Sequence, residues 1–153
     1  MTMAPFGPQS AGDGAFPNAG SRQQMTRELQ KILHVDDDPD IREIARIALE
    51  TVGGFEVTQC DSGTQALTVA PRFAPDLILL DYMMPGMDGA ETLKNLRTIT
   101  MLQDVPVVFM TAKAQEDSRA TLLECGATDV VIKPFDPMTL ADTIRQIWDR
   151  VEA

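Results

Sequence analysis

Residues 76–89 read DLILLDYMMPGMDG, and this stretch decides the fold. Leu77–Leu80 form an unbroken apolar run between Pro75 and the Pro85–Gly86 turn. Such a run predicts a short strand that is buried on both faces. It ends on a single acid, Asp81. A carboxylate at that position would lie at the carboxyl edge of an open α/β sheet, where such sheets bind their ligands.

On both sides of this stretch, short apolar strands alternate with helical patterns. Strands are predicted over residues 32–35, 55–60, 77–81, 105–111 and 129–132. Four helix starts are marked by capping residues: Asp38–Pro39, Ser62 with Gln65, Asp88 with Glu91, and Asp136–Pro137. Strands alternating with helices predict right-handed βαβ units. We therefore expect one doubly wound α/β domain, with a single five-stranded parallel sheet and helices on both faces.

Two helices have predicted limits that a structure can test. The second helix is expected to end near Pro71. The last helix is expected to begin at Asp136–Pro137 and to bury a stripe made of Leu140, Ile144, Ile147, Trp148 and Val151.

Composition limits the classes of function. The chain has 153 residues and a formal net charge of −10, which argues against direct binding of nucleic acid. Cys60 and Cys125 lack metal-ligand spacing and are expected to be reduced, buried small hydrophobic residues, which fits a cytoplasmic protein. Apolar runs stay well below the ~20 residues of a membrane span, and there is no pattern of a secretory signal.

The amino terminus differs from the rest of the chain. Met1 to Arg27 are rich in Gly, Pro, Ala, Ser and Gln and show no hydrophobic period. This composition predicts a disordered extension over residues 1–27 and a globular domain over residues 28–153.

Four of the five predicted strands end on residues suited to phosphoryl transfer. They are Asp36 and Asp37, Asp81, Thr111 and Lys133. In a parallel sheet these ends converge on one edge. Two carboxylates about 4 Å apart repel each other by about 4 kcal/mol at an effective dielectric near 20, and a divalent cation removes that cost. Oxygen ligands without His or Cys indicate Mg²⁺ or Mn²⁺.

With such a cation, the Asp81 carboxylate can attack phosphorus and form an aspartyl phosphate. Lys133 would place a positive charge on a phosphoryl oxygen, and the Thr111 hydroxyl would donate a hydrogen bond. Each residue alone has an ordinary explanation as a turn or cap residue. Their joint placement at successive strand ends is what favours the chemical interpretation.

Four motifs in this order resemble the receiver domain of two-component response regulators. They are ILHVDDDP at residues 32–39, LILLDYMMPGMDG at 77–89, VVFMTA at 107–112 and VVIKPF at 130–135. The resemblance covers about Gln30 to Val151. It implies the flavodoxin-like (βα)5 fold with strand order 2-1-3-4-5.

The resemblance also implies a role for each matching residue. Asp81 corresponds to the phosphorylated aspartate, which also binds the metal. Asp37 corresponds to a direct metal ligand, and Asp36 to an acid that binds the metal directly or through water. Met83 would contribute its backbone carbonyl to the metal. Thr111 and Lys133 correspond to the switch hydroxyl and the site lysine, with a cis Lys133–Pro134 bond.

The implied function is a signalling switch rather than an enzyme on an external substrate. A sensor histidine kinase or a histidine phosphotransfer protein would phosphorylate Asp81 with Mg²⁺. A stand-alone receiver would then signal through a protein partner bound by the last strands and helices, or pass the group on in a phosphorelay.

Three positions leave details of this switch open. Val130 replaces the aromatic residue that many receivers have on the fifth strand, so the coupling to Thr111 cannot be carried over unchanged. Met83 and Lys113 are expected at the rim of the site, and we hypothesise that bulky Met83 slows autodephosphorylation.

Other functions remain alternatives. The main one is an interaction module with the receiver fold that works without phosphorylation. A flavin-binding domain would need a phosphate-binding loop where Asp36–Asp38 stand, and an aspartate-nucleophile hydrolase would usually have an acid at Met83. His34 is expected to be a buried strand residue and not a phosphohistidine.

Overall fold

The computed structural model describes residues 27–112 and 116–152. The chain divides into a compact unit, Leu29–Val151, and a second unit formed by Met1–Glu28 with Glu152–Ala153. Residues 1–26 of the predicted disordered extension lie outside the described part of the chain. All that follows concerns the compact unit.

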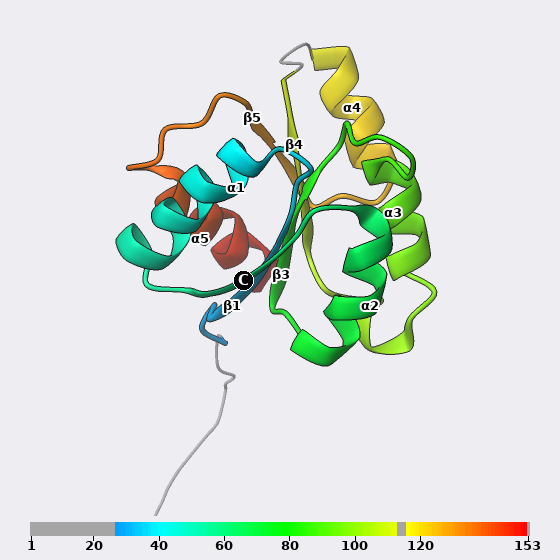
Figure 1. Ribbon diagram of the computed structural model, residues 1–153, viewed down its shortest axis with the longest axis horizontal. Coiled ribbons are helices and arrows are strands. Elements are labelled where there is room, and N and C mark those ends of the chain that lie inside the picture. The colour runs from blue at the N-terminus through cyan, green and yellow to red at the C-terminus, as the bar shows by residue number, and fades with distance from the viewer. Residues whose placement is uncertain (1–26, 113–115, 153) are drawn as a thin grey trace, which may run out of the picture. The chain divides into compact units, whose positions relative to one another are not determined.

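Five parallel strands form one sheet at the centre of this unit (Figure 1). They are β1 (Lys31–Val35), β2 (Glu56–Cys60), β3 (Leu77–Asp81), β4 (Val107–Thr111) and β5 (Asp129–Ile132). Their order in the sheet is β2-β1-β3-β4-β5, as the resemblance to receiver domains implied. All five residues of the central strand β3 are buried.

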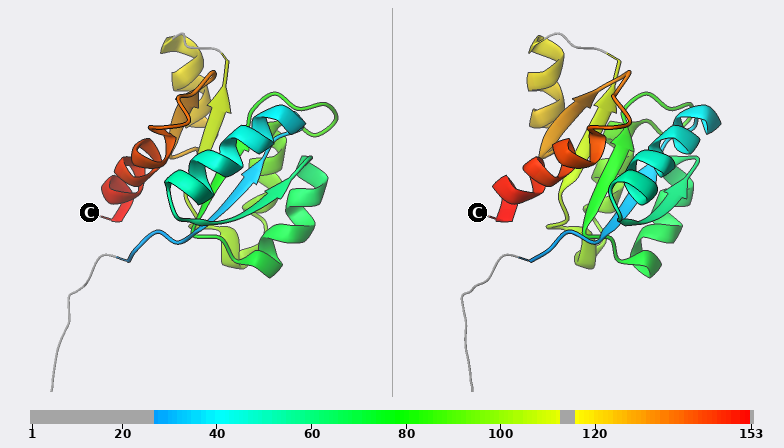
Figure 2. Two further views of the ribbon diagram at one scale, coloured as in Figure 1. Left: turned by 60° about the vertical axis from the view of Figure 1, so that its left-hand side comes forward. Right: turned by 90° about the vertical axis from the view of Figure 1, so that its left-hand side faces the viewer.

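Helices cover both faces of the sheet (Figures 1 and 2). They are α1 (Pro39–Arg46), which continues as a π-helical stretch (Ile47–Val52), α2 (Gly63–Phe73), α3 (Gly89–Leu96), α4 (Glu116–Glu124) and α5 (Leu140–Glu152), with a short 3₁₀ turn at Thr100–Leu102. The side of the sheet that holds Leu77 and Leu79 packs against α5 and against the π-helical stretch that continues α1. The opposite side, with Ile78 and Leu80, packs against α2, α3 and α4. Alternate residues of one strand thus fill two core layers, each fully buried aliphatic side chain contributing about 1.5–3 kcal/mol.

Three of the predicted helix caps are present. The Asp38 side chain accepts a hydrogen bond from the backbone N–H of Asp40 at the start of α1. Ser62 Oγ accepts one from Gln65 N at 3.1 Å, and Asp88 Oδ1 accepts one from Glu91 N at 2.9 Å. These side chains satisfy backbone donors that have no partner within the helix.

Of the two predicted helix limits, the end near Pro71 is met to within two residues, whereas the start at Asp136–Pro137 was wrong. Pro71 lies inside α2, which ends at Phe73 because Ala74 adopts a left-handed conformation with φ of 54°. Within the last turn a proline removes one backbone donor without ending the helix. The last helix begins at Leu140 rather than at Asp136–Pro137. Asp136 instead starts a turn, its Oδ1 accepting a hydrogen bond from Met138 N at 2.8 Å.

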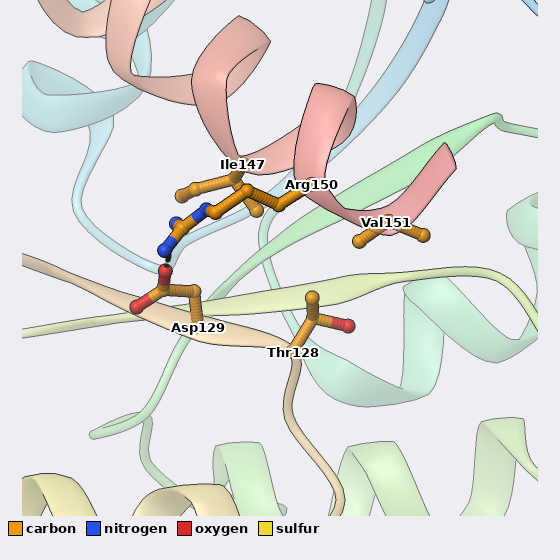
Figure 3. A pocket seen from close by; sticks show the side chains of 5 residues that line it. All are labelled: Thr128, Asp129, Ile147, Arg150 and Val151. Carbon is orange, nitrogen blue, oxygen red and sulfur yellow. Dashed lines mark hydrogen bonds and ion pairs between the residues drawn. The ribbon is translucent and has the colours of Figure 1, made fainter. Parts of the chain in front are cut away.

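The predicted buried stripe of the last helix is one residue too long. Leu140, Ile144, Ile147 and Trp148 are buried, whereas Val151 is 40% exposed. Val151 lines an open pocket of about 220 Å³ together with Thr128, Asp129, Ile147 and Arg150 (Figure 3). The last turn of the helix therefore borders solvent rather than the core.

Asp129 fastens edge strand β5 to a helix on each face. Its Oδ1 lies 2.6 Å from Arg119 Nη2 of α4, and its Oδ2 lies 2.5 Å from Arg150 Nη2 of α5. Figure 3 shows the Arg150 side chain reaching from α5 to this carboxylate. The two ion pairs therefore link β5, which has a neighbouring strand on one side only, to helices on both faces of the sheet.

Within the described ranges, 27–112 and 116–152, no helix is long and apolar enough to cross a membrane.

Candidate functional site

The sheet brings the predicted site residues to its carboxyl edge. Asp36 follows β1 directly, Asp81 ends β3, Thr111 ends β4 and Lys133 follows β5. These four strands are consecutive neighbours in the sheet. Because the strands are parallel, their carboxyl ends lie side by side in space although they are far apart in the sequence.

Three of these acids form a group that we call the acidic cluster: Asp36, Asp37 and Asp81. One carboxylate oxygen from each residue lies within 4.8 Å of the others. Asp36 and Asp81 are buried, with 0% and 3% exposure, whereas Asp37 is exposed. The cluster thus has two fixed inner carboxylates and one outer carboxylate open to solvent.

Lys133 bridges the two inner carboxylates. Its Nζ lies 3.0 Å from Asp36 Oδ2 and 3.1 Å from Asp81 Oδ1. Burial by itself lowers the pKa of Lys133, but the close contact and negative charge of the Asp36 carboxylate, and then of the Asp81 carboxylate, outweigh burial and raise the pKa above its usual value. The ammonium group therefore stays charged next to the acids.

The Asp81 carboxylate binds its proton more tightly than an exposed aspartate does. Burial, followed by the negative charge of Asp36, raises its pKa to about 6, against the opposing effects of Lys133 and of the backbone N–H of Met83. That N–H donates to Asp81 Oδ1 at 3.3 Å. One lysine thus compensates the buried acids only in part.

The residues present fit a hard divalent cation. The buried Asp36 Oδ2 has no hydrogen bond of acceptable geometry within the described part of the chain, although it lies at ion-pair distance from Lys133. The carboxylates of the acidic cluster offer oxygen donors, which Mg²⁺ and Mn²⁺ prefer. An unused buried lone pair beside two further carboxylates is what a metal site requires.

Other predicted positions lie around this cluster. Thr111 is buried at the end of β4, one residue beyond Met110, which pairs with Asp81. The Met83 side chain is 61% exposed, and Val130 is buried in β5. Lys113 lies outside the described residues. The Lys133–Pro134 bond is cis, as the resemblance implied.

Sequence reasoning did not find a polar network behind Asp36. Arg42 Nη1 donates to the backbone carbonyl of Asp36 at 2.7 Å, and Gln59 Nε2 donates to the carbonyl of Arg42 at 2.7 Å and lies 3.0 Å from His34 Nδ1. Burial, with the charges of Lys133, Arg42 and Arg46, lowers the pKa of His34 to about 3. The spacing of His34 and Asp36 along one strand could have placed both side chains on the same side.

Gly89 was also missed. A Cβ atom at this position would lie 2.7 Å from the backbone carbonyl of Asp81 and 2.7 Å from the Cα of Tyr82. The start of α3 can approach the end of β3 this closely only with glycine. Its place directly after the capping residue Asp88 is a weak signal in a single sequence.

Residues 32–145 match the family model described as the response regulator receiver domain. The chain belongs to this family. The matched segment contains β1 to β5 and the acidic cluster.

Relatives of this receiver domain are transcriptional regulators. It is 40% identical over 119 residues to the phosphate regulon transcriptional regulatory protein PhoB of Pseudomonas aeruginosa, covering 78% of this chain and 52% of that protein. It is also 40% identical over 128 residues to the probable transcriptional regulator ycf27 of Pyropia yezoensis, covering 84% of this chain and 51% of that protein. The chain thus spans about half the length of these curated relatives.

Solved structures show the same fold over whole domains. The receiver domain aligns with the chemotaxis protein CheY4 of Vibrio cholerae with a TM-score of 0.73 and 31% identity, covering 78% of this chain and 99% of that one. It aligns with the receiver domain of a signal transduction histidine kinase from Syntrophus aciditrophicus with a TM-score of 0.69 and 30% identity, covering 80% and 92%. The predicted family and fold are therefore confirmed.

Proposed function

We propose that this receiver domain accepts a phosphoryl group on Asp81, with Mg²⁺ or Mn²⁺ in the acidic cluster. The observation that supports this most is the pairing of Lys133 with both inner carboxylates, at 3.0 Å from Asp36 and 3.1 Å from Asp81. A lysine between buried acids at the carboxyl edge of a parallel sheet provides a nucleophile, a place for a cation and a counter-charge in one location.

The site residues have distinct roles in this proposal, and Asp81 has two, as phosphoacceptor and as metal ligand. An Asp81 carboxylate oxygen attacks phosphorus, a new P–O bond forms, and the bond from phosphorus to the donor breaks, so that the donor leaves without its phosphoryl group. Lys133 is the fixed cation on one side of the reacting group, and the Thr111 hydroxyl donates a hydrogen bond to it. Asp36, Asp37, Asp81 and the Met83 backbone carbonyl would hold Mg²⁺. When bound, Mg²⁺ supplies the positive charge that lets two anions approach.

The partners follow from the family and from charge. We propose a sensor histidine kinase or a histidine phosphotransfer protein as phosphoryl donor, and a protein target bound by β4, α4, β5 and α5. The net charge of −10 favours protein contacts over direct contact with nucleic acid. The division into a disordered extension over residues 1–27 and a receiver domain over residues 28–153 stays a prediction.

Phosphorylation by a small donor tests this function without any partner. The purified chain is incubated with acetyl phosphate and Mg²⁺, and its intact mass is measured. We expect a single phosphoryl adduct that is absent in Asp81→Asn and absent when the divalent cation is chelated.

Asp88→Asn serves as the control, because Asp88 is an acid in the same loop that caps α3 and lies outside the acidic cluster. It should keep the adduct. An unmodified wild-type mass under conditions that phosphorylate another receiver would contradict the proposal and favour an interaction module that works without phosphorylation.

A further inference from the structure

His34 and Asp36 present two buried polar atoms to each other. Within residues 27–112 and 116–152, His34 Nε2 and Asp36 Oδ2 are the buried side-chain atoms that have no hydrogen bond, and the distance between them is 4.0 Å. Both residues are fully buried. Asp36 Oδ2 still has the ammonium group of Lys133 at 3.0 Å, whereas His34 Nε2 has no hydrogen-bond partner in the described part of the chain. Leaving a buried donor or acceptor without a partner costs about 1–3 kcal/mol, so the position of His34 Nε2 beside this carboxylate calls for an explanation.

Gln59 determines where His34 holds its proton. The Gln59 side-chain nitrogen lies 2.7 Å from the carbonyl oxygen of Arg42, and the opposite amide orientation would put two acceptors against each other. The same nitrogen lies 3.0 Å from His34 Nδ1, so its second N–H points to that ring nitrogen. Nδ1 therefore accepts, and the imidazole proton is on Nε2. That N–H faces Asp36.

The network returns to Asp36 through α1. Arg42, whose carbonyl accepts from Gln59, donates its guanidinium Nη1 to the Asp36 carbonyl oxygen at 2.7 Å. Asp36 Oδ1 accepts from the Asp38 backbone N–H at 2.9 Å. The other carboxylate oxygen has Lys133 on one side and His34 Nε2 on the other. Hydrogen bonds thus connect Asp36 to Arg42, Arg42 to Gln59 and Gln59 to His34. The remaining gap is the 4.0 Å between His34 Nε2 and Asp36 Oδ2.

We propose that His34 is a positioning residue whose Nε2–H donates to Asp36 Oδ2 and holds the inner carboxylate in its orientation toward the acidic cluster, with Gln59 fixing the tautomer. Closing the gap to a hydrogen bond of about 2.9 Å needs a movement of about 1 Å, which rotation of the Asp36 carboxylate can provide. Metal-binding side chains depend on such supporting hydrogen bonds for their orientation. The effect on metal binding rests on the proposed function, whereas the hydrogen bond itself does not.

The tautomer can be read directly by nuclear magnetic resonance, because the chain contains one histidine. With ¹⁵N-labelled imidazole and no divalent cation present, we expect one neutral tautomer with the proton on Nε2, and a slowly exchanging Nε2–H signal. Gln59→Leu removes the donor to Nδ1 and should give a mixture of tautomers. Asp36→Asn should shift the Nε2 resonance. A proton on Nδ1 in the wild type, or an Nε2 resonance that is unchanged in Asp36→Asn, would overturn the proposal.

Two substitutions at His34 separate positioning from packing. His34→Gln keeps an amide near the place of Nε2, whereas His34→Asn keeps one only near Nδ1. With Mg²⁺ binding measured by calorimetry, His34→Asn should weaken binding by about tenfold, the usual cost of losing a supporting partner. His34→Gln should stay within about threefold of wild type. Equal losses in both variants would indicate a packing role only and overturn the proposal.

The His34–Asp36 hydrogen bond and the proposed phosphorylation of Asp81 can be contradicted separately. If His34→Asn does not fold, the wild-type and Gln59→Leu spectra decide the matter alone. If the tautomer and its dependence on Asp36 are found but no phosphoryl adduct forms, the proposed function is wrong and the hydrogen bond stands. If the adduct forms while the proton is on Nδ1, the positioning role is wrong and the function stands.

Discussion

Met83 combines two roles in one residue, because its backbone N–H contacts the phosphoacceptor candidate while its side chain is 61% exposed. An exposed thioether next to Asp81 can limit the approach of water without binding it. We predict that Met83→Asn speeds loss of the phosphoryl group by about tenfold, equivalent to about 1.4 kcal/mol in activation free energy.

The rate follows from the decay of the phosphorylated mass with time. Met101→Asn is the matched control, since Met101 is 51% exposed but lies in the 3₁₀ turn between α3 and β4, away from the carboxyl edge. Equal decay in the wild type and Met83→Asn would contradict the role assigned to the side chain.

The two thiols should differ sharply in reactivity. Cys60 is buried at the end of β2, and burial, with the nearby charge of Asp61, raises its pKa to about 11. Cys125 is exposed, so the predicted burial of this thiol was wrong. The thiolate is the reactive form, so at pH 8 a thiol reagent should label Cys125 quickly and Cys60 slowly.

The labelling rate of Cys60 should increase with pH. Because the pKa of Cys60 in the folded protein lies above 9, its labelling rate should rise by about tenfold per pH unit between pH 8 and 10. Cys125→Ser should remove the fast phase and leave the slow one. Two fast phases at pH 8 would show that Cys60 is not buried as described.

At the scale of elements, Asp129 connects β5 to α4 and α5. Its two arginine partners are about half and two-thirds exposed, so the ion pairs are partly screened. A buried carboxylate with two charged hydrogen bonds still contributes more than a surface pair. We predict that Asp129→Asn lowers the free energy of unfolding by about 1–2 kcal/mol in urea titrations.

An exposed pair in another helix gives the comparison. Arg46 Nη1 lies 3.3 Å from Glu50 Oε2 in an i,i+4 arrangement, and the two side chains are 48% and 38% exposed. Glu50→Gln should cost about 0.5 kcal/mol or less. Similar losses in Asp129→Asn and Glu50→Gln would mean that the double ion pair adds no stability beyond a surface pair.

Local signals predicted most elements but not all of their ends. The caps at Asp38, Ser62 and Asp88 were visible because each is followed by a helical pattern, and the structure contains them. Pro71 marks the end of α2 only to within two residues because a last turn can contain a proline, and Asp136 misled because an acidic turn before a helix uses the same residues as a true start. Only the backbone path distinguishes these cases.

At the scale of the whole molecule, the convergence of distant strand ends follows from topology. A run that ends on Asp81, a parallel sheet and short connections are enough to predict that Asp36, Thr111 and Lys133 lie at one edge. The hydrogen-bond network of His34, Gln59 and Arg42 could not be predicted, because it depends on side-chain conformations across three elements.

The compact unit, Leu29–Val151, contains both core layers and all five strands found in the described part of the chain. The extension has the composition of a chain that cannot bury apolar surface. We predict that deleting residues 1–24 changes the melting temperature by less than about 2 °C, well under the shift expected for 1 kcal/mol in a domain of this size. A clear drop in melting temperature by calorimetry would show that the extension packs on the domain.

The central claim is that Asp81, and no other group, accepts phosphorus. Borohydride reduces an aspartyl phosphate to homoserine, so the protein is treated with acetyl phosphate and Mg²⁺, reduced, digested and examined by peptide mass spectrometry. The account predicts homoserine at position 81 alone, and none when Mg²⁺ is chelated. Homoserine at position 36 or 37 instead, or an unmodified Asp81 in a protein that has gained a phosphoryl group elsewhere, would contradict it.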